Sequence, residues 1–169
     1  MISVSKIIDR FEPAMLSKLI KAIKSARRWN AALDKASLKQ FQDALILMEE
    51  IYAILGLVPG DKKAPCQFNI FTGYLMARLQ AYQKAILILL ETKVQIADDE
   101  HFTESDKNYL TYYANLTLCW SALQAGDIET IEKCKTVRAF DISDLQKVKS
   151  HLRTKFPITI TNSSIIPSG

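Results

Sequence analysis

The sequence QFNIFTGYLMARLQAYQKAILILLETKVQIA, residues 67–97, has the spacing of one long helix. Between Tyr74 and Leu90 its residues are apolar on nearly every side, and Gln80, Lys84 and Glu91 fall within one narrow arc. A helix that is apolar almost all round is normally buried. The sequence therefore predicts a single helix from Gln67 to Ala97 at the centre of the fold.

Segments on both sides of this stretch also repeat apolar residues at steps of three and four, the period of a helix. Pro13 suits the first turn of a helix, and Gly56 and Gly126 suit helix ends. We predict an all-α fold, an irregular bundle of five to seven helices, as one domain over residues 1–156. Residues 157–169 alternate branched apolar and hydroxyl side chains and are predicted to form a short extended or flexible C-terminal tail.

Composition separates this chain from several classes of protein. It has 169 residues, of which 49% are hydrophobic and 24% charged, as in globular domains. Its longest aliphatic run, residues 85–90, is far below the roughly 20 residues that span a bilayer, so we expect no membrane insertion. The first ten residues alternate charged and apolar side chains, unlike a signal peptide. With three cysteines and no CxxC spacing, the sequence favours a cytoplasmic protein.

The strongest charge signal lies near the N-terminus. Residues 1–40 contain nine Lys and Arg against three Asp and Glu. Five of the basic residues lie in the helix predicted over 13–33, and they form a candidate binding face: Lys18, Lys21, Lys24, Arg27 and Arg28. Such a face can neutralise phosphates or an acidic partner. A merely solvated helix face is the alternative interpretation.

Two further sets of residues are candidate sites. The tail carries Ile158, Ile160, Ile165 and Ile166, which can contact a partner or dock on the protein's own bundle. Cys119 and Cys134 lie at the same level of the helical hairpin predicted around Gly126, so they form a possible thiol pair. The alternative for this pair is two inert thiols in the core.

No motif for catalysis or metal binding is present. His101 and His151 lie in no recognisable motif, and the chain lacks GxSxG, P-loop and GxGxxG patterns. The acidic loop 98–106 lacks the calcium-loop pattern. We therefore predict no catalytic residues, no metal and no cofactor, and a protein-interaction module, either an adaptor or a small regulator. The alternative is a binder of nucleic acid or acidic surfaces, a helical enzyme comes third, and a homo-oligomer is compatible with the sequence.

The segment Gln124-Ala-Gly-Asp-Ile128 resembles the turn between the two helices of a tetratricopeptide repeat, with Leu118 at a matching apolar position. Other positions depart from that pattern, since Ile131 replaces a small residue and Asn115 and Ala122 replace aromatic ones. No period of about 34 residues recurs, so no repeat array is predicted.

Overall fold

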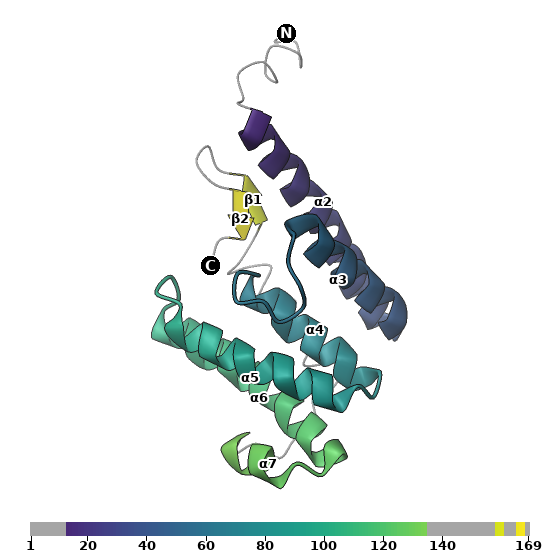
Figure 1. The fold of residues 1–169 in the computed structure, drawn as a ribbon, viewed down its shortest axis with the longest axis vertical. Coiled ribbons are helices and arrows are strands. Elements are labelled where there is room, and N and C mark those ends of the chain that lie inside the picture. Colours follow the sequence, from purple (N-terminus) through teal and green to yellow (C-terminus); the bar gives the residue numbers. More distant parts are fainter. Residues whose placement is uncertain (1–12, 135–157, 161–164, 168–169) are drawn as a thin grey trace.

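The computed structural model describes residues 13–134, 158–160 and 165–167, and in these residues it is a helical bundle (Figure 1). The prediction of an all-α bundle is confirmed. The described helices are α2 (Pro13–Ser37), α3 (Phe41–Leu55), α4 (Cys66–Arg78), α5 (Tyr82–Asp98), α6 (Glu104–Ala125) and α7 (Ile128–Cys134). In the tail, β1 (Ile158–Ile160) pairs antiparallel with β2 (Ile165–Pro167), so that Ile160 lies opposite Ile165. The spacing of Leu145, Val148 and Leu152 also predicts a last helix that begins at Ser143, and this segment lies outside the described residues.

The prediction of one helix over 67–97 is wrong, because the chain turns back at Leu79-Gln80-Ala81 and forms α4 and α5. Gln80 adopts a left-handed conformation with φ of 64°, and the Ala81 N–H donates to the Met76 carbonyl over 2.8 Å. This hydrogen bond satisfies a carbonyl at the helix end. The sequence did not reveal the turn because glycine and proline, the usual signals, are absent from it.

Two other pairs of helices are joined by the same turn. Lys39 between α2 and α3 has φ of 61°, and Gly126 between α6 and α7 has φ of 71°. After each, the next N–H donates to a carbonyl five residues earlier, from Gln40 to Lys35 over 2.9 Å and from Asp127 to Ala122 over 2.9 Å. The described helices therefore form three antiparallel hairpins, which follow one another down the long axis in Figure 1.

The first two hairpins also share a sequence pattern. Residues 36–44 read ASLKQFQDA and residues 77–85 read ARLQAYQKA, 41 positions later. Burial follows the same shift, since the five buried residues of α2 all have buried counterparts in α4: Ser25 and Cys66, Trp29 and Ile70, Ala32 and Gly73, Leu33 and Tyr74, Ala36 and Ala77. A period of about 34 residues does not reveal this internal repeat, because the repeat is 41 residues long and few residues are identical between its two copies.

Neighbouring hairpins stack through an aromatic contact that also repeats. Phe41, at the start of α3, meets Tyr74 of α4 edge to face with ring centroids 6.1 Å apart. Tyr82, at the start of α5, meets Trp120 of α6 in the same way at 5.9 Å. The Cζ atom of Arg78 lies 5.0 Å from the Phe41 ring centroid and 5.6 Å from that of Trp120. One guanidinium thus links both interfaces through cation–π contacts.

The centre of the stack is α4, in which 11 of 13 residues are buried. By contrast, α2 buries only one face. At the positions where α4 has Phe68, Phe71 and Leu75, α2 has Arg27, Asn30 and Asp34, all exposed. A helix at the end of a stack needs such a polar outer side, and none of the described helical hairpins lies beyond α2.

In the sequence, Tyr109, Tyr112, Leu116, Cys119 and Leu123 follow one another at steps of three and four, which predicts an inward-facing aromatic seam with Trp120 beside it. In α6 this seam is only partly buried. Leu116 and Cys119 are buried and Tyr109 is half-buried, but Tyr112 and Leu123 are 46% and 44% exposed. The prediction that Trp120 is buried is also wrong, since its ring is half-buried. In the structure α6 packs against α4, α5 and α7 at once, and these contacts turn inward a different arc of the helix from the one that its periodicity predicts.

A buried network of hydrogen bonds connects the loop after α3 to α4 and α5. The Asn69 Oδ1 atom accepts from the Tyr52 hydroxyl over 2.6 Å and from the Gly60 N–H over 3.0 Å. The Asn69 Nδ2 atom donates to the Asp61 carbonyl and to Gln95 Oε1, each over 3.1 Å. Burial raises the pKa of the Tyr52 hydroxyl, which therefore keeps the proton that it donates. All four hydrogen-bonding positions of the Asn69 amide are used, so this network stabilises the fold.

Candidate functional site

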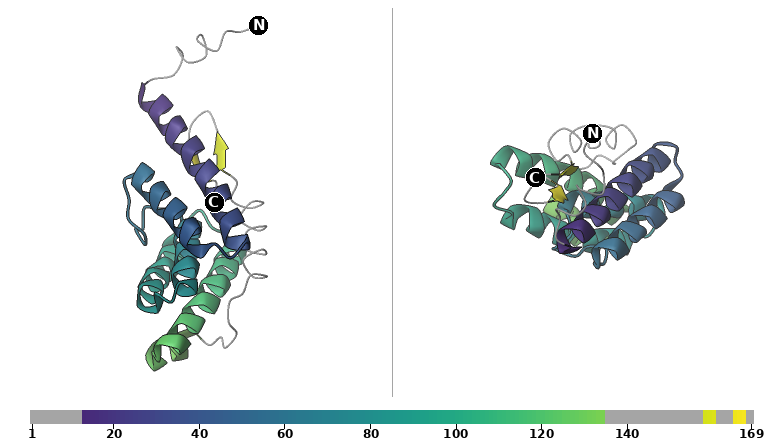
Figure 2. Two further views of the ribbon diagram at one scale, coloured as in Figure 1. Left: turned by 90° about the vertical axis from the view of Figure 1, so that its right-hand side faces the viewer. Right: turned by 90° about the horizontal axis from the view of Figure 1, so that it is seen from above.

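The first three turns of α2 extend beyond the repeated unit. The repeat pairs Ser25 with Cys66, the first residue of α4, so residues 13–24 of α2 have no counterpart in α4. This extension projects past the end of α3, as Figures 1 and 2 show. Hairpin stacking does not require it, and its side chains are therefore candidates for another role.

An apolar stripe runs along this extension, formed by Met15, Leu16, Leu19, Ile20 and Ile23. Met15, Ile20 and Ile23 are 40%, 44% and 37% exposed, and Leu16 and Leu19 are half-buried. The sequence pattern placed these residues on one face with Leu33, but the structure separates them. At 100° per residue, the stripe lies about a third of a turn away from the face of α2 that packs in the core.

A groove lies along one edge of this stripe, between α2 and the last turn of α3. Its volume is about 500 Å³. Of the described residues, six from α2 and one from α3 line it. Those of α2 are Pro13, Leu16, Ser17, Ile20, Lys21 and Lys24, and that of α3 is Ile54. The groove has apolar walls with two ammonium groups at its rim, and it could receive apolar side chains of another molecule.

The predicted basic face is divided by the structure. Arg28 Nε donates to Glu50 Oε2 over 2.6 Å and so joins α2 to α3. Lys18, Lys21, Lys24 and Arg27 have no ion pair within the described part of the chain. These four side chains are exposed and are available to an anionic partner.

The two thiols of the candidate pair are both buried, and neither is in a disulfide. Burial raises the pKa of Cys134, and the neighbouring Cys119 raises it further. A raised pKa keeps a thiol protonated and poorly nucleophilic. Formation of a disulfide between Cys119 and Cys134 on oxidation stays a prediction.

The tail residues lie in the short β hairpin, Ile158 and Ile160 in β1 and Ile165 and Ile166 in β2. This hairpin contacts α2 and lies beside it in Figures 1 and 2. Whether the tail also contacts a partner stays a prediction.

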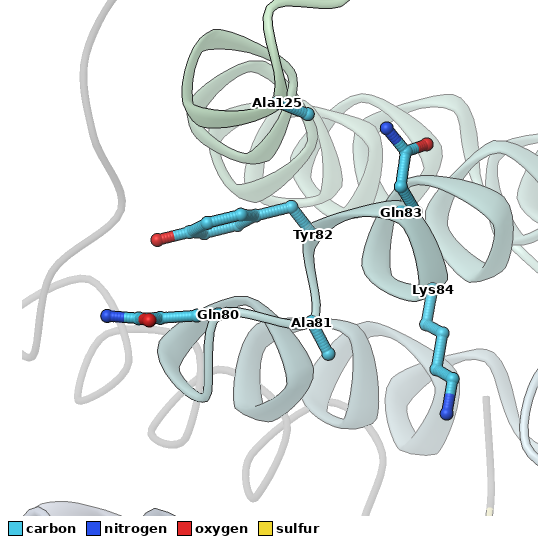
Figure 3. A pocket seen from close by; sticks show the side chains of 6 residues that line it. All are labelled: Gln80, Ala81, Tyr82, Gln83, Lys84 and Ala125. Atoms are coloured by element: carbon cyan, nitrogen blue, oxygen red, sulfur yellow. The ribbon is translucent and has the colours of Figure 1, made fainter.

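A second hollow, of about 370 Å³, lies at the turn between α4 and α5 (Figure 3). Its lining residues are Gln80, Ala81, Tyr82, Gln83, Lys84 and Ala125. Gln80 and Tyr82 project to the same side of the turn in Figure 3. Among the described residues, no carboxylate, thiol or imidazole lines this hollow, so they offer no pair of groups there for acid–base or nucleophilic catalysis.

The acidic loop before α6 serves as a helix cap. Thr103 Oγ1 accepts from the Asp106 N–H over 3.2 Å, and the Thr103 N–H donates to Asp106 Oδ2 over 3.3 Å. This reciprocal pair satisfies two backbone donors at the start of α6. Within residues 13–134, no group of three His, Cys, Asp or Glu side chains is arranged to hold a metal ion. None of the described helices has the length and apolar character required to span a membrane.

Comparisons of the chain with protein-family models, with curated proteins and with solved structures find no match.

Proposed function

We propose that this protein is a non-enzymatic protein-interaction module, an adaptor or small regulator, that acts through the α2 apolar stripe. The observation that carries this proposal is the exposure of Met15, Ile20 and Ile23 on an extension that the hairpin stack does not need. Exposed apolar side chains that gather in one patch are costly in water and commonly mark interaction sites. The stripe lies on one long rigid helix, which favours recognition with little loss of conformational freedom.

Site-specific photocrosslinking in the native cell extract tests this proposal. A photoreactive residue at position 20 samples the stripe, and one at position 87 samples a matched apolar position on α5, where Leu87 is 65% exposed. We expect one dominant protein to crosslink from position 20 and not from position 87. The same weak set of proteins from both positions would contradict the proposal.

A second candidate function is binding of nucleic acid or of another acidic surface through the basic face. Its support is that Lys18, Lys21, Lys24 and Arg27 are exposed and have no ion pair with the described residues. Phosphate contacts release counterions, so such binding must weaken steeply as salt rises. Retention on DNA that falls with salt and is lost in a Lys18→Gln/Lys21→Gln/Lys24→Gln variant would favour this function. Unchanged retention of that variant would exclude the face.

A further inference from the structure

The charged side chains that α2 itself contributes around the apolar stripe are all basic. From Pro13 to Leu33 the chain has five basic residues and no Asp or Glu. At 100° per residue, Lys18 borders one edge of the stripe and Lys24 borders the other, while Arg27 lies beyond its C-terminal end. An apolar surface framed on both sides by ammonium groups selects a partner with carboxylates in the matching places.

The spacing within the stripe indicates the shape of the partner. Met15, Leu19 and Ile23 are four residues apart, and Leu16 and Ile20 form a parallel row beside them. Two adjacent rows at this spacing form a ridge that packs against the apolar face of another helix. The groove next to Ile54 can receive side chains from that helix at one edge of the ridge.

We propose that the α2 apolar stripe and the adjoining groove bind an amphipathic helix of a partner protein whose apolar face is flanked by Asp and Glu. This inference rests on the proposed function and adds the chemistry of the partner. Apolar contacts with Met15, Ile20 and Ile23 supply affinity, and ion pairs with Lys18, Lys21 and Lys24 set the orientation and exclude basic helices.

A second copy of this chain fits the surface poorly. Two α2 stripes packed together would place Lys18 and Lys24, at the edges of each stripe, near the same residues of the other copy, and like charges at a contact are unfavourable. Nucleic acid fits poorly as well, because the centre of the surface is apolar and phosphates would meet only its edges.

The test uses the full chain and two labelled synthetic helices of about three heptads each, both with Leu at the a and d positions. One carries Glu at e and g and the other carries Lys, and fluorescence anisotropy reports binding. We expect the Glu peptide to bind, with affinity that falls as salt rises, and the Lys peptide not to bind. Ile20→Ser should weaken binding about tenfold or more. Lys21→Glu/Lys24→Glu should weaken the Glu peptide and allow the Lys peptide to bind.

Matched controls are available on α5. Leu87→Ser removes an exposed apolar side chain and Lys84→Glu reverses an exposed charge, and neither should change binding. Ile20 is 44% exposed, so Ile20→Ser should keep the helical circular dichroism and melting temperature of the parent. A variant that fails this check is replaced by Ile23→Ser, which tests the same stripe.

Several outcomes would overturn the inference. Equal binding of both peptides would show that charge does not select the partner. Binding that Ile20→Ser leaves unchanged would show that the α2 apolar stripe is not the binding surface. If the chain self-associates in sedimentation and Ile20→Ser abolishes this, a second copy of the chain occupies the surface. If vesicles rich in phosphatidylserine bind the chain and the Glu peptide does not, the surface binds a membrane. If only an uncharged or Lys peptide binds through Ile20, the inference fails but the proposed function stands. If no peptide binds and position 20 crosslinks to nothing, both fail.

Discussion

The Tyr82 ring meets the Trp120 ring edge to face, with centroids 5.9 Å apart and planes at 87°. The same relationship joins Phe41 and Tyr74, at 6.1 Å and 85°, one hairpin earlier. In both pairs, the first residue of a hairpin's second helix meets the ring six positions before the left-handed turn residue of the next hairpin. The described helical hairpins are thus stacked by repetition of one interface.

The two aromatic pairs should contribute similar coupling energies. Edge-to-face pairs add about 0.5–1.5 kcal/mol beyond the burial of their area. Double-mutant cycles to alanine, measured by urea unfolding, are expected to give this value for Tyr82 with Trp120 and again for Phe41 with Tyr74. Trp120→Ala alone should cost about 2–3 kcal/mol, below the cost of removing a fully buried ring, because Trp120 is half-buried. A coupling near zero in one pair would show that the two interfaces are not equivalent.

Asn69→Ala should be among the most destabilising substitutions. It removes four hydrogen bonds, leaves the Gly60 N–H without its acceptor, and leaves the Tyr52 hydroxyl with only the longer contact to Thr72 Oγ1 at 3.3 Å. A buried polar group that loses its partner costs about 1–3 kcal/mol, so a loss of at least about 3 kcal/mol in the free energy of unfolding is expected. The matched control is Asn108→Ala on the exposed face of α6, which should change stability by less than about 0.5 kcal/mol. Equal effects of the two variants would refute the role of the network.

Gly73→Ala should destabilise the protein even though alanine is the better helix former. A Cβ atom at Gly73 would lie 2.8 Å from Cγ and Cδ2 of Leu89, which is fully buried on α5. Overpacking costs about 1–3 kcal/mol, against about 1 kcal/mol gained in helix propensity. Thermal melts are expected to show a lower Tm for Gly73→Ala and a partial recovery in Gly73→Ala/Leu89→Val. Stabilisation by Gly73→Ala alone would mean that α5 leaves room for a Cβ atom at position 73, which contradicts the close contact with Leu89.

Cys66 should make stability fall in alkaline solution. Burial and the nearby Asp99 carboxylate raise the pKa of its thiol to about 12, whereas an unfolded cysteine has a pKa of about 8.5. Because the folded pKa is the higher one, this contribution is complete below the unfolded pKa and is lost as pH rises toward 12. Between about pH 8 and pH 9, where tyrosine ionisation contributes little, unfolding free energies of Cys66→Ala should decline less steeply than those of the parent. Parallel declines would contradict the burial of this thiol.

Local pattern accounts for most of the helices. Besides the helix over 13–33, helical spacing predicts a helix over 37–55 and one that is capped at Thr103 and runs to Ala125. These segments correspond to α2, α3 and α6, and Gly126 ends α6 with φ of 71°. Helical periodicity and glycine at a helix end depend on residues a few positions apart, so one sequence is enough to detect them. The basic side chains of α2 were recognised for the same reason, because charge is visible without a structure.

Only the tertiary structure showed what these helices pack against. The turn at Gln80 has no sequence signal, and it divides the predicted central helix into the two helices of one hairpin. The Met15 and Ile20 side chains belong to a regular apolar pattern, yet they are exposed, because the first turns of α2 extend past the end of α3 (Figure 1). Periodicity determined by itself that these residues share a helical face. Which face is buried depends on long-range contacts between hairpins, and the single-helix pattern contains no information about them.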